Sequence, residues 1–180
     1  MNKRELELRR QKFECEALAH LDDLMRTAIH IAHSRQDGED IIQETYLRAW
    51  RYFDSFEPGT NCRAWLFRIM FNVIKGKRGK LSRLSETPLE DLIGIDDSSS
   101  NVVMFDPLRQ IEGHEILEFT NQLSQEYRSV LWLVVVEEFS YRETAEILDV
   151  PIGTVMSRLH RARNELRKLL LTGKASGAGS

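Results

Sequence analysis

The stretch from Ser140 to Leu169 limits the possible folds more than any other part of the sequence. Ser140 is followed three residues later by Glu143, a spacing that forms a capping box and predicts the start of a helix. Pro151 and Gly153 then predict a short turn. A second helix is predicted from around Thr154, because five apolar residues follow at steps of four and three. They are Val155, Leu159, Ala162, Leu166 and Leu169.

The opposite face of this second helix is polar and basic. It carries Met156, Ser157, His160, Arg161, Asn164 and Lys168. A short helix, a tight turn and a basic second helix are typical of a helix-turn-helix, whose second helix enters the major groove of DNA. An ordinary amphipathic basic helix remains the alternative interpretation of these residues.

The N-terminal part of the sequence also predicts helices. Apolar residues recur at steps of three and four over residues 13–31, which indicates one helix face. We expect Asp37-Gly38 to end that helix and a second helix to cover residues 39–53. A loop at Pro58-Gly59 precedes a third helix that starts near residues 61–63.

Residues 123–139 form a long apolar segment whose secondary structure the periodicity does not decide. The LWLVVV sequence at its centre has a high β-propensity and could form a strand, whereas the length and the polar ends of the segment favour a buried helix. Taken with the helices on either side, the expected fold is all-α, with two small helical domains.

Charge divides the chain into three parts. The whole protein has a formal net charge of −3, but residues 81–118 carry two basic and nine acidic side chains. This acidic segment also contains prolines and a serine tract, which are typical of a flexible linker. We therefore expect domains at residues 1–80 and 108–172, an acidic linker at residues 81–107, and a disordered tail at residues 173–180.

Several classes of protein are disfavoured by composition. The sequence has no apolar run long enough for a transmembrane helix and no signal peptide, so a cytoplasmic location is expected. Cys15 and Cys62 make no disulfide framework, and His30 and His33 lack further ligands for a metal. No catalytic triad or phosphate-binding loop is present, so we expect neither an enzyme nor a cofactor.

Two stretches of the N-terminal part have features beyond packing. Asp40, Gln43, Glu44 and Leu47 fall on one helical face, which is either solvated or a docking surface for a basic partner. The span from Arg63 to Arg83 contains seven basic residues and no acid. Aromatic residues interrupt it, and cations interleaved with rings favour nucleic-acid binding. These aromatic residues are Trp65, Phe67 and Phe71.

Taken in order, these stretches resemble the extracytoplasmic-function (ECF) group of sigma factors in the sigma-70 family. FECEALAHLDDLMRTA resembles region 2.1, and DGEDIIQETYLRAW resembles region 2.2, which binds core RNA polymerase. GTNCRAWLFRIMFNVIKGKRGK resembles regions 2.3 and 2.4, which melt the promoter and read its −10 element. The segment from Leu123 to Leu166 resembles region 4, which binds the −35 element.

The resemblance implies a role for each set of residues. The resemblance implies that core polymerase contacts the protein through its β and β′ subunits. The residues implied to dock on the β′ clamp helices are Asp40, Gln43, Glu44 and Leu47. At the −10 element, the residues implied to hold the DNA are Asn72, Lys75, Lys77 and Arg78. Those implied to support strand opening or the local core are Trp65, Phe67 and Phe71. Those implied at the −35 element are Arg142, Gly153, Thr154, Met156, Ser157, Arg158, His160 and Arg161.

The resemblance also implies partners, and two alternatives remain. It implies promoter DNA and core RNA polymerase as partners, an acidic linker threaded through the polymerase, and control by an anti-sigma factor. Met156 departs from the family pattern, since many relatives carry a basic or polar residue there. Base readout at this position is expected to be either weaker or apolar, toward a thymine methyl. One alternative is a stand-alone helix-turn-helix regulator, which would bind duplex DNA tightly without polymerase. The other is a helical adaptor or enzyme accessory subunit with no nucleic-acid role.

Overall fold

The computed structural model describes the backbone of residues 2–82 and 119–176, and the side chains of residues 2–77 and 119–171. Residues 2–82, here called the N-terminal half, form α1 (Lys3–Ala17), the 3₁₀ turn η1 (Leu18–His20), α2 (Leu21–Ala32), α3 (Arg35–Tyr52), the 3₁₀ turn η2 (Phe53–Ser55) and α4 (Cys62–Ser82). Residues 119–176, the C-terminal half, form α6 (Gln125–Val135), α7 (Tyr141–Leu148) and α8 (Ile152–Ser176).

Both described segments are helical and contain no strand, which confirms the all-α prediction. The apolar segment that could have been a strand forms α6, whose first turn is capped by the Ser124 side chain. Within these segments, no helix has the length and apolar character required to cross a membrane. The expected linker at residues 81–107 lies almost wholly outside the described residues.

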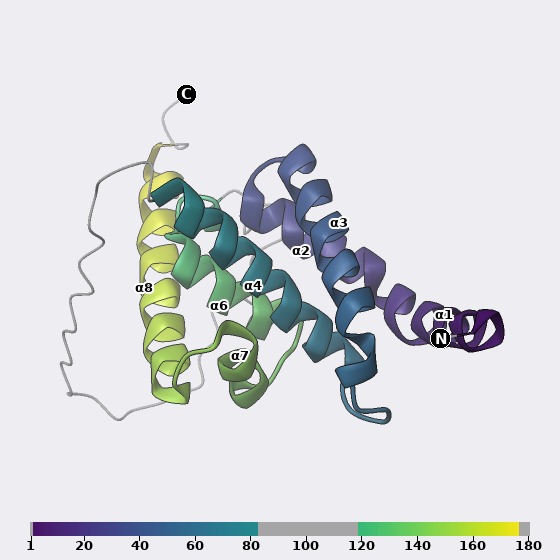
Figure 1. Cartoon of the computed structure of the whole chain (residues 1–180). Helices are drawn as coiled ribbons and strands as arrows, with labels where there is room; N and C mark the ends of the chain where they lie inside the picture. The colour runs from purple at the N-terminus through teal and green to yellow at the C-terminus, as the bar shows by residue number, and fades with distance from the viewer. Residues whose placement is uncertain (1, 83–118, 177–180) are drawn as a thin grey trace.

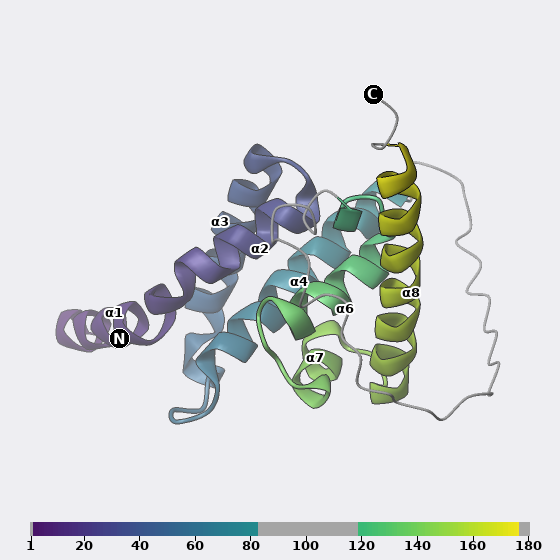
Figure 2. The ribbon, with the colours of Figure 1, turned by 180° about the vertical axis from the view of Figure 1, so that it is seen from behind.

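The two halves pack against each other. Figures 1 and 2 show α1 at one end of the molecule and α8 at the other, with α4 lying between α3 and the helices of the C-terminal half. One hydrophobic core is built mainly from α2, α3 and α4, but it also includes Leu133, Phe139 and Ile147 of the C-terminal half. A second core, containing Val130, Val155 and Leu166, holds α6 to α8.

A glycine allows the close contact between α2 and α3. A Cβ at Gly38 would lie 2.6 Å from Ile29 Cγ1 and 2.9 Å from the Ile29 backbone, so only glycine fits without displacing α2. The expectation that Asp37-Gly38 ends a helix is therefore wrong. The chain turns earlier, at His33 (φ 58°), and Ser34 then caps α3.

Other helix boundaries also differ from the sequence prediction. The helix face predicted over residues 13–31 is divided between α1 and α2 by η1. The long C-terminal helix begins at Ile152, two residues before the predicted start, and continues to Ser176. Residues 173–176, expected to be disordered, thus form its last turn. The third predicted helix, α4, passes through Gly76 and Gly79 to Ser82, beyond the expected domain end at residue 80.

Candidate nucleic-acid interface

The predicted helix-turn-helix is formed by α7 and α8. The Ser140 hydroxyl accepts a hydrogen bond from Glu143 N, and the Glu143 carboxylate accepts one from Ser140 N at 3.0 Å, so the capping box is confirmed. The Ser140 hydroxyl also donates to the Glu143 carboxylate at 2.7 Å. This bond first, and the bond from Ser140 N second, lower the pKa of Glu143. Asp149 (φ 56°) ends α7 in the left-handed conformation, and Thr154 N donates to Pro151 O at 2.9 Å in the first turn of α8.

The apolar stripe of α8 faces the core as predicted, which leaves the predicted DNA face outward. Val155, Leu159, Ala162 and Leu166 are buried. Of the predicted −35 residues on α8, Gly153, Met156, Ser157, His160 and Arg161 are exposed, while Thr154 and Arg158 are half-buried. Arg142 is exposed on the neighbouring helix α7, where it pairs with Glu146 at 3.6 Å.

This outward face is suited to base-edge and phosphate contacts. Side-chain hydroxyl, imidazole and guanidinium groups stand at the N-terminal end of a helix, which is the end that reads bases in helix-turn-helix proteins. The Ser157 hydroxyl donates to Thr154 O at 3.1 Å, and the His160 ring lies 2.9 Å from the Asn164 amide. These local contacts orient two of the polar side chains before any DNA is bound.

The predicted −10 residues do not form one surface. Asn72 and Lys75 are exposed on α4, and Arg68, four residues before Asn72, extends the same polar stripe. Lys77 lies instead beside Asp40, 4.0 Å from its carboxylate. The backbone of Arg78 continues α4, and its side chain lies outside the described ones.

The aromatic side chains predicted at the −10 element are part of the core. Phe67 has no exposed surface, Phe71 is buried, and Trp65 is half-buried with its ring 5.1 Å from that of Phe56. Of the roles that the resemblance allowed, Phe67 and Phe71 take the local-core one, because a ring must be accessible to stack on a base and neither ring is accessible in this conformation. Their i, i+4 spacing in an amphipathic helix was the signal for the core instead.

The predicted polymerase-binding residues are together on α3. Asp40, Gln43 and Leu47 are exposed, with Leu47 56% exposed, and Glu44 is half-buried and pairs with Arg48 at 2.6 Å. With Val73, Gly76 and Lys77 of α4 they border a shallow depression of about 500 Å³. The two carboxylates of this α3 face each lie beside a cation, Asp40 beside Lys77 and Glu44 beside Arg48, so the rim of the depression carries both charges around an exposed leucine.

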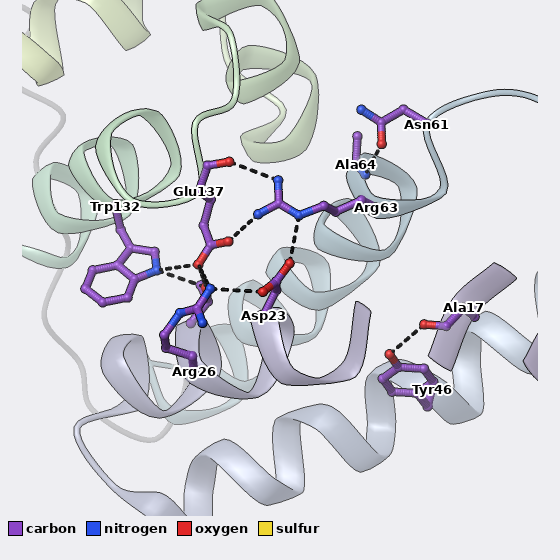
Figure 3. Close-up of polar contacts among 10 residues, drawn as sticks. Ala17, Asp23, Arg26, Tyr46, Asn61, Arg63, Ala64, Trp132 and Glu137 are labelled. Carbon is purple, nitrogen blue, oxygen red and sulfur yellow. Dashed lines mark hydrogen bonds and ion pairs between the residues drawn. The ribbon is translucent and has the colours of Figure 1, made fainter. Parts of the chain in front are cut away.

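The structure also gathers residues that the sequence reasoning did not connect. Glu137, in the turn after α6, is buried against Thr27 of α2 and Arg63 of α4 (Figure 3). Arg63, read from sequence as part of a basic stretch, therefore points toward the C-terminal half. Little signal was available, because Glu137 stands beside a second glutamate, Glu138, at the polar end of the apolar segment. Among the described residues, no group of His, Cys, Asp and Glu could hold a metal ion.

His30 lies half-buried at the same junction, and its Nε2 has no hydrogen-bond partner within the described segments. Its ring stacks on Trp132 of α6 with centroids 3.7 Å apart. Burial, the positive charge of Arg128 and the neighbouring His33 together lower the pKa of His30 to about 4. The His30 ring is therefore neutral near pH 7, and it contributes packing rather than charge to the junction.

Comparisons with known proteins identify both halves. Residues 17–83 match the family model described as Sigma-70 region 2, and residues 113–166 match Sigma-70, region 4. The chain is 34% identical to ECF RNA polymerase sigma factor EcfG of Rhodopseudomonas palustris (strain TIE-1), over 90% of this chain and 87% of that one. It is 30% identical to ECF RNA polymerase sigma factor SigW of Bacillus subtilis (strain 168), over 89% and 92% of the respective chains.

A solved structure gives the same relationship. The sigma factor RpoE of Bartonella quintana, determined in complex with the anti-sigma factor NepR, is 31% identical and superposes with a TM-score of 0.68. The match covers 89% of this chain and 97% of that one. The helix-turn-helix, the acidic α3 face and these matches to both regions lead to one conclusion: the protein is a member of the ECF group of RNA polymerase sigma factors.

Proposed function

We propose that this protein binds core RNA polymerase through the acidic face of α3 and directs it to promoters by reading two DNA elements. The observation that carries the proposal is the pairing of an exposed acidic docking face on α3 with an outward helix-turn-helix face on α8 in one chain. Region 2 would occupy residues 1–80 and region 4 residues 108–172, with the acidic residues 81–107 passing through the polymerase.

The DNA contacts are divided between the two halves. Asn72, Lys75 and the adjacent Arg68 would hold the unpaired strand at the −10 element, because their side chains form the exposed polar stripe of α4. The exposed residues of α8 would read the −35 element, with Met156 against a thymine methyl and Arg161 at a guanine or a phosphate. Lys77 would serve polymerase docking rather than DNA, since it pairs with Asp40.

The protein's work in this proposal is binding alone. The polymerase supplies the chemistry of RNA synthesis, and the sigma factor acts in the cytoplasm where the polymerase acts. Because the Bartonella quintana relative was determined with an anti-sigma factor, control of this protein by such a factor is part of the proposal. Its overall charge of −3 fits a protein that needs polymerase to hold DNA tightly.

The proposal is tested by affinity for core RNA polymerase at near-physiological salt. The variant Asp40→Arg/Glu44→Arg should lower this affinity at least about 100-fold, since it places like charges against a basic partner. The matched control is Glu7→Arg/Glu14→Arg, which changes the net charge equally on exposed positions of α1 and also removes one helical ion pair.

Free duplex DNA is the second ligand in the same experiment. Tight polymerase binding that is lost in the α3 variant and retained in the control, with weak duplex binding, supports the proposal. Equal binding by the two variants would remove α3 from the docking surface. Tight duplex binding without polymerase affinity would instead favour the stand-alone regulator.

A further inference from the structure

Three polar side chains form a connected series along the outward part of α8, the helix at one side of the molecule in Figure 1. His160, Asn164 and Arg167 stand four and three residues apart, so they fall on one side of the helix. The amide nitrogen Nδ2 of Asn164 lies 2.9 Å from His160 Nε2. Arg167 Nη1 donates a hydrogen bond to the Asn164 oxygen Oδ1 at 3.3 Å. These three residues are called the His160 relay.

Arg167 determines which way the Asn164 amide faces. A guanidinium group only donates hydrogen bonds, so it must meet the amide oxygen rather than the amide nitrogen. The oxygen is therefore turned toward Arg167, and the NH₂ group is turned toward His160. An amide NH₂ group also only donates, so His160 Nε2 must accept. Because a neutral imidazole carries one proton, that proton is on Nδ1.

The relay leaves the Nδ1–H group of His160 available to an external partner. His160 is exposed, whereas Asn164 behind it is half-buried. Within the part of the chain that the structure describes, Asn164 makes the only polar contact with the His160 ring. The ring therefore presents a hydrogen-bond donor on the outward face of α8, and its acceptor nitrogen is already occupied.

A donor at this position distinguishes cytosine from the other three bases. In the major groove, guanine presents the acceptors N7 and O6, adenine presents N7, and thymine presents O4. Cytosine presents only its N4 amine, which is a donor. The Nδ1–H group can thus bond to guanine, adenine or thymine, but it meets cytosine donor to donor. The opposite tautomer would present an acceptor and would favour cytosine instead.

We propose that Asn164 and Arg167 are positioning residues for base selection, which hold His160 as a hydrogen-bond donor and so exclude cytosine at the −35 base that His160 meets. The proposal rests on the proposed function, because base selection requires α8 to lie in the major groove. Guanine is the preferred base, since it offers two acceptors side by side. Asn164 and Arg167 contribute without touching a base, by fixing the tautomer before DNA is bound.

Nitrogen NMR of the full chain measures the tautomer without polymerase or DNA. The chemical shifts of the two ring nitrogens show which one carries the proton, and at about pH 8 an ordinary imidazole is neutral. The His160 signals are assigned by their loss in His160→Gln. In the wild-type protein the proton should be on Nδ1. A wild-type ring that carries its proton mainly on Nε2 would overturn the relay.

Substitutions of Asn164 give opposite expectations in the same measurement. Asn164→Asp keeps the shape but replaces the NH₂ donor with an acceptor oxygen, so the proton should move to His160 Nε2. Asn164→Gln keeps an amide donor and should retain the proton on Nδ1. Glu165→Gln is the matched control at the next position, which is exposed, and should change nothing. The same tautomer in Asn164→Asp and in the wild type would refute the positioning role.

Base selection is measured with the protein bound to core polymerase, on promoters randomised through the −35 element. His160→Ala identifies the base pair that His160 meets, because the preference there should be lost. At this base pair the wild type should prefer guanine to cytosine at least about tenfold. Asn164→Asp should lose most of this ratio, whereas Asn164→Gln and Glu165→Gln should keep it. Ratios are compared because an added negative charge weakens binding to all sequences alike.

The two measurements separate the possible failures. An unchanged base ratio in Asn164→Asp, with its tautomer reversed, would show that His160 does not select a base, and the proposal would be wrong. A chain that binds neither polymerase nor promoter DNA would refute the proposed function and base selection with it. The tautomer of His160 would still be measured in that chain, so the relay stands or falls on its own evidence.

Discussion

The close contact between α2 and α3 gives a prediction with a definite sign. At Gly38, a Cβ would lie 2.6 Å from Ile29 Cγ1 and 2.9 Å from both Cα and N of Ile29. Two of these neighbours are backbone atoms, which move only if α2 itself moves. Overpacking of this kind costs about 1–3 kcal/mol, and the involvement of backbone places Gly38→Ala toward the upper end.

Helix propensity opposes this cost by a smaller amount. Replacing glycine with alanine inside a helix favours folding by about 1 kcal/mol. The expected net effect of Gly38→Ala is therefore a loss of about 1–2 kcal/mol in the free energy of unfolding. Gly76→Ala, in α4, is the matched control, because a Cβ there would have no neighbour within 4 Å. That control should gain about 0.5–1 kcal/mol.

Equilibrium urea denaturation of the full chain measures both variants against the wild type. The expected difference between them is about 1.5–3 kcal/mol, which shifts the midpoint by about 0.5–3 M for a chain whose slope is near 1–3 kcal/mol per molar urea. If Gly38→Ala were as stabilising as Gly76→Ala, the two helices could not be as close as the structure has them. Unchanged slopes would show that the substitutions act on stability rather than on compactness.

Two further predictions concern the junction and the helix-turn-helix. Because the pKa of His30 is lowered from 6.5 to about 4 in the folded chain, the unfolded chain binds the proton first, and stability falls as the pH drops through this interval. Between pH 7 and pH 5 the loss is at most about 2 kcal/mol, and about 1 kcal/mol for a ring that is partly exposed. Urea denaturation at the two pH values should show it, His30→Gln should reduce it, and the exposed His160→Gln should leave it unchanged. Ser140→Ala removes the cap of α7 and should lower the free energy of unfolding by about 1 kcal/mol, whereas Ser157→Ala, on the outward face of α8, should change it by less than about 0.5 kcal/mol. Equal losses in these two serine variants would contradict the capping interpretation.

Local sequence patterns determined most of the helices. The α8 stripe was readable because burial on one face of a helix imposes a period of 3.6 residues on the sequence itself. The α7 cap was readable because Ser140 and Glu143 bond to atoms within three residues of themselves. The acidic face of α3 was readable for the same reason, since positions 40, 43, 44 and 47 fall together on any helix.

Long-range contacts decided the rest, and these leave no local signature. Gly38 reads as a helix breaker, but Ile29 on another helix makes glycine the residue that fits there. Phe67 and Arg63 read as members of a basic, aromatic DNA-binding stretch. The first packs on Phe139 and the second pairs with Glu137, both more than seventy residues away. Which face of α4 meets the solvent, and which charge is neutralised, depends on what the other half of the chain places against it, and only the tertiary structure brings those groups together.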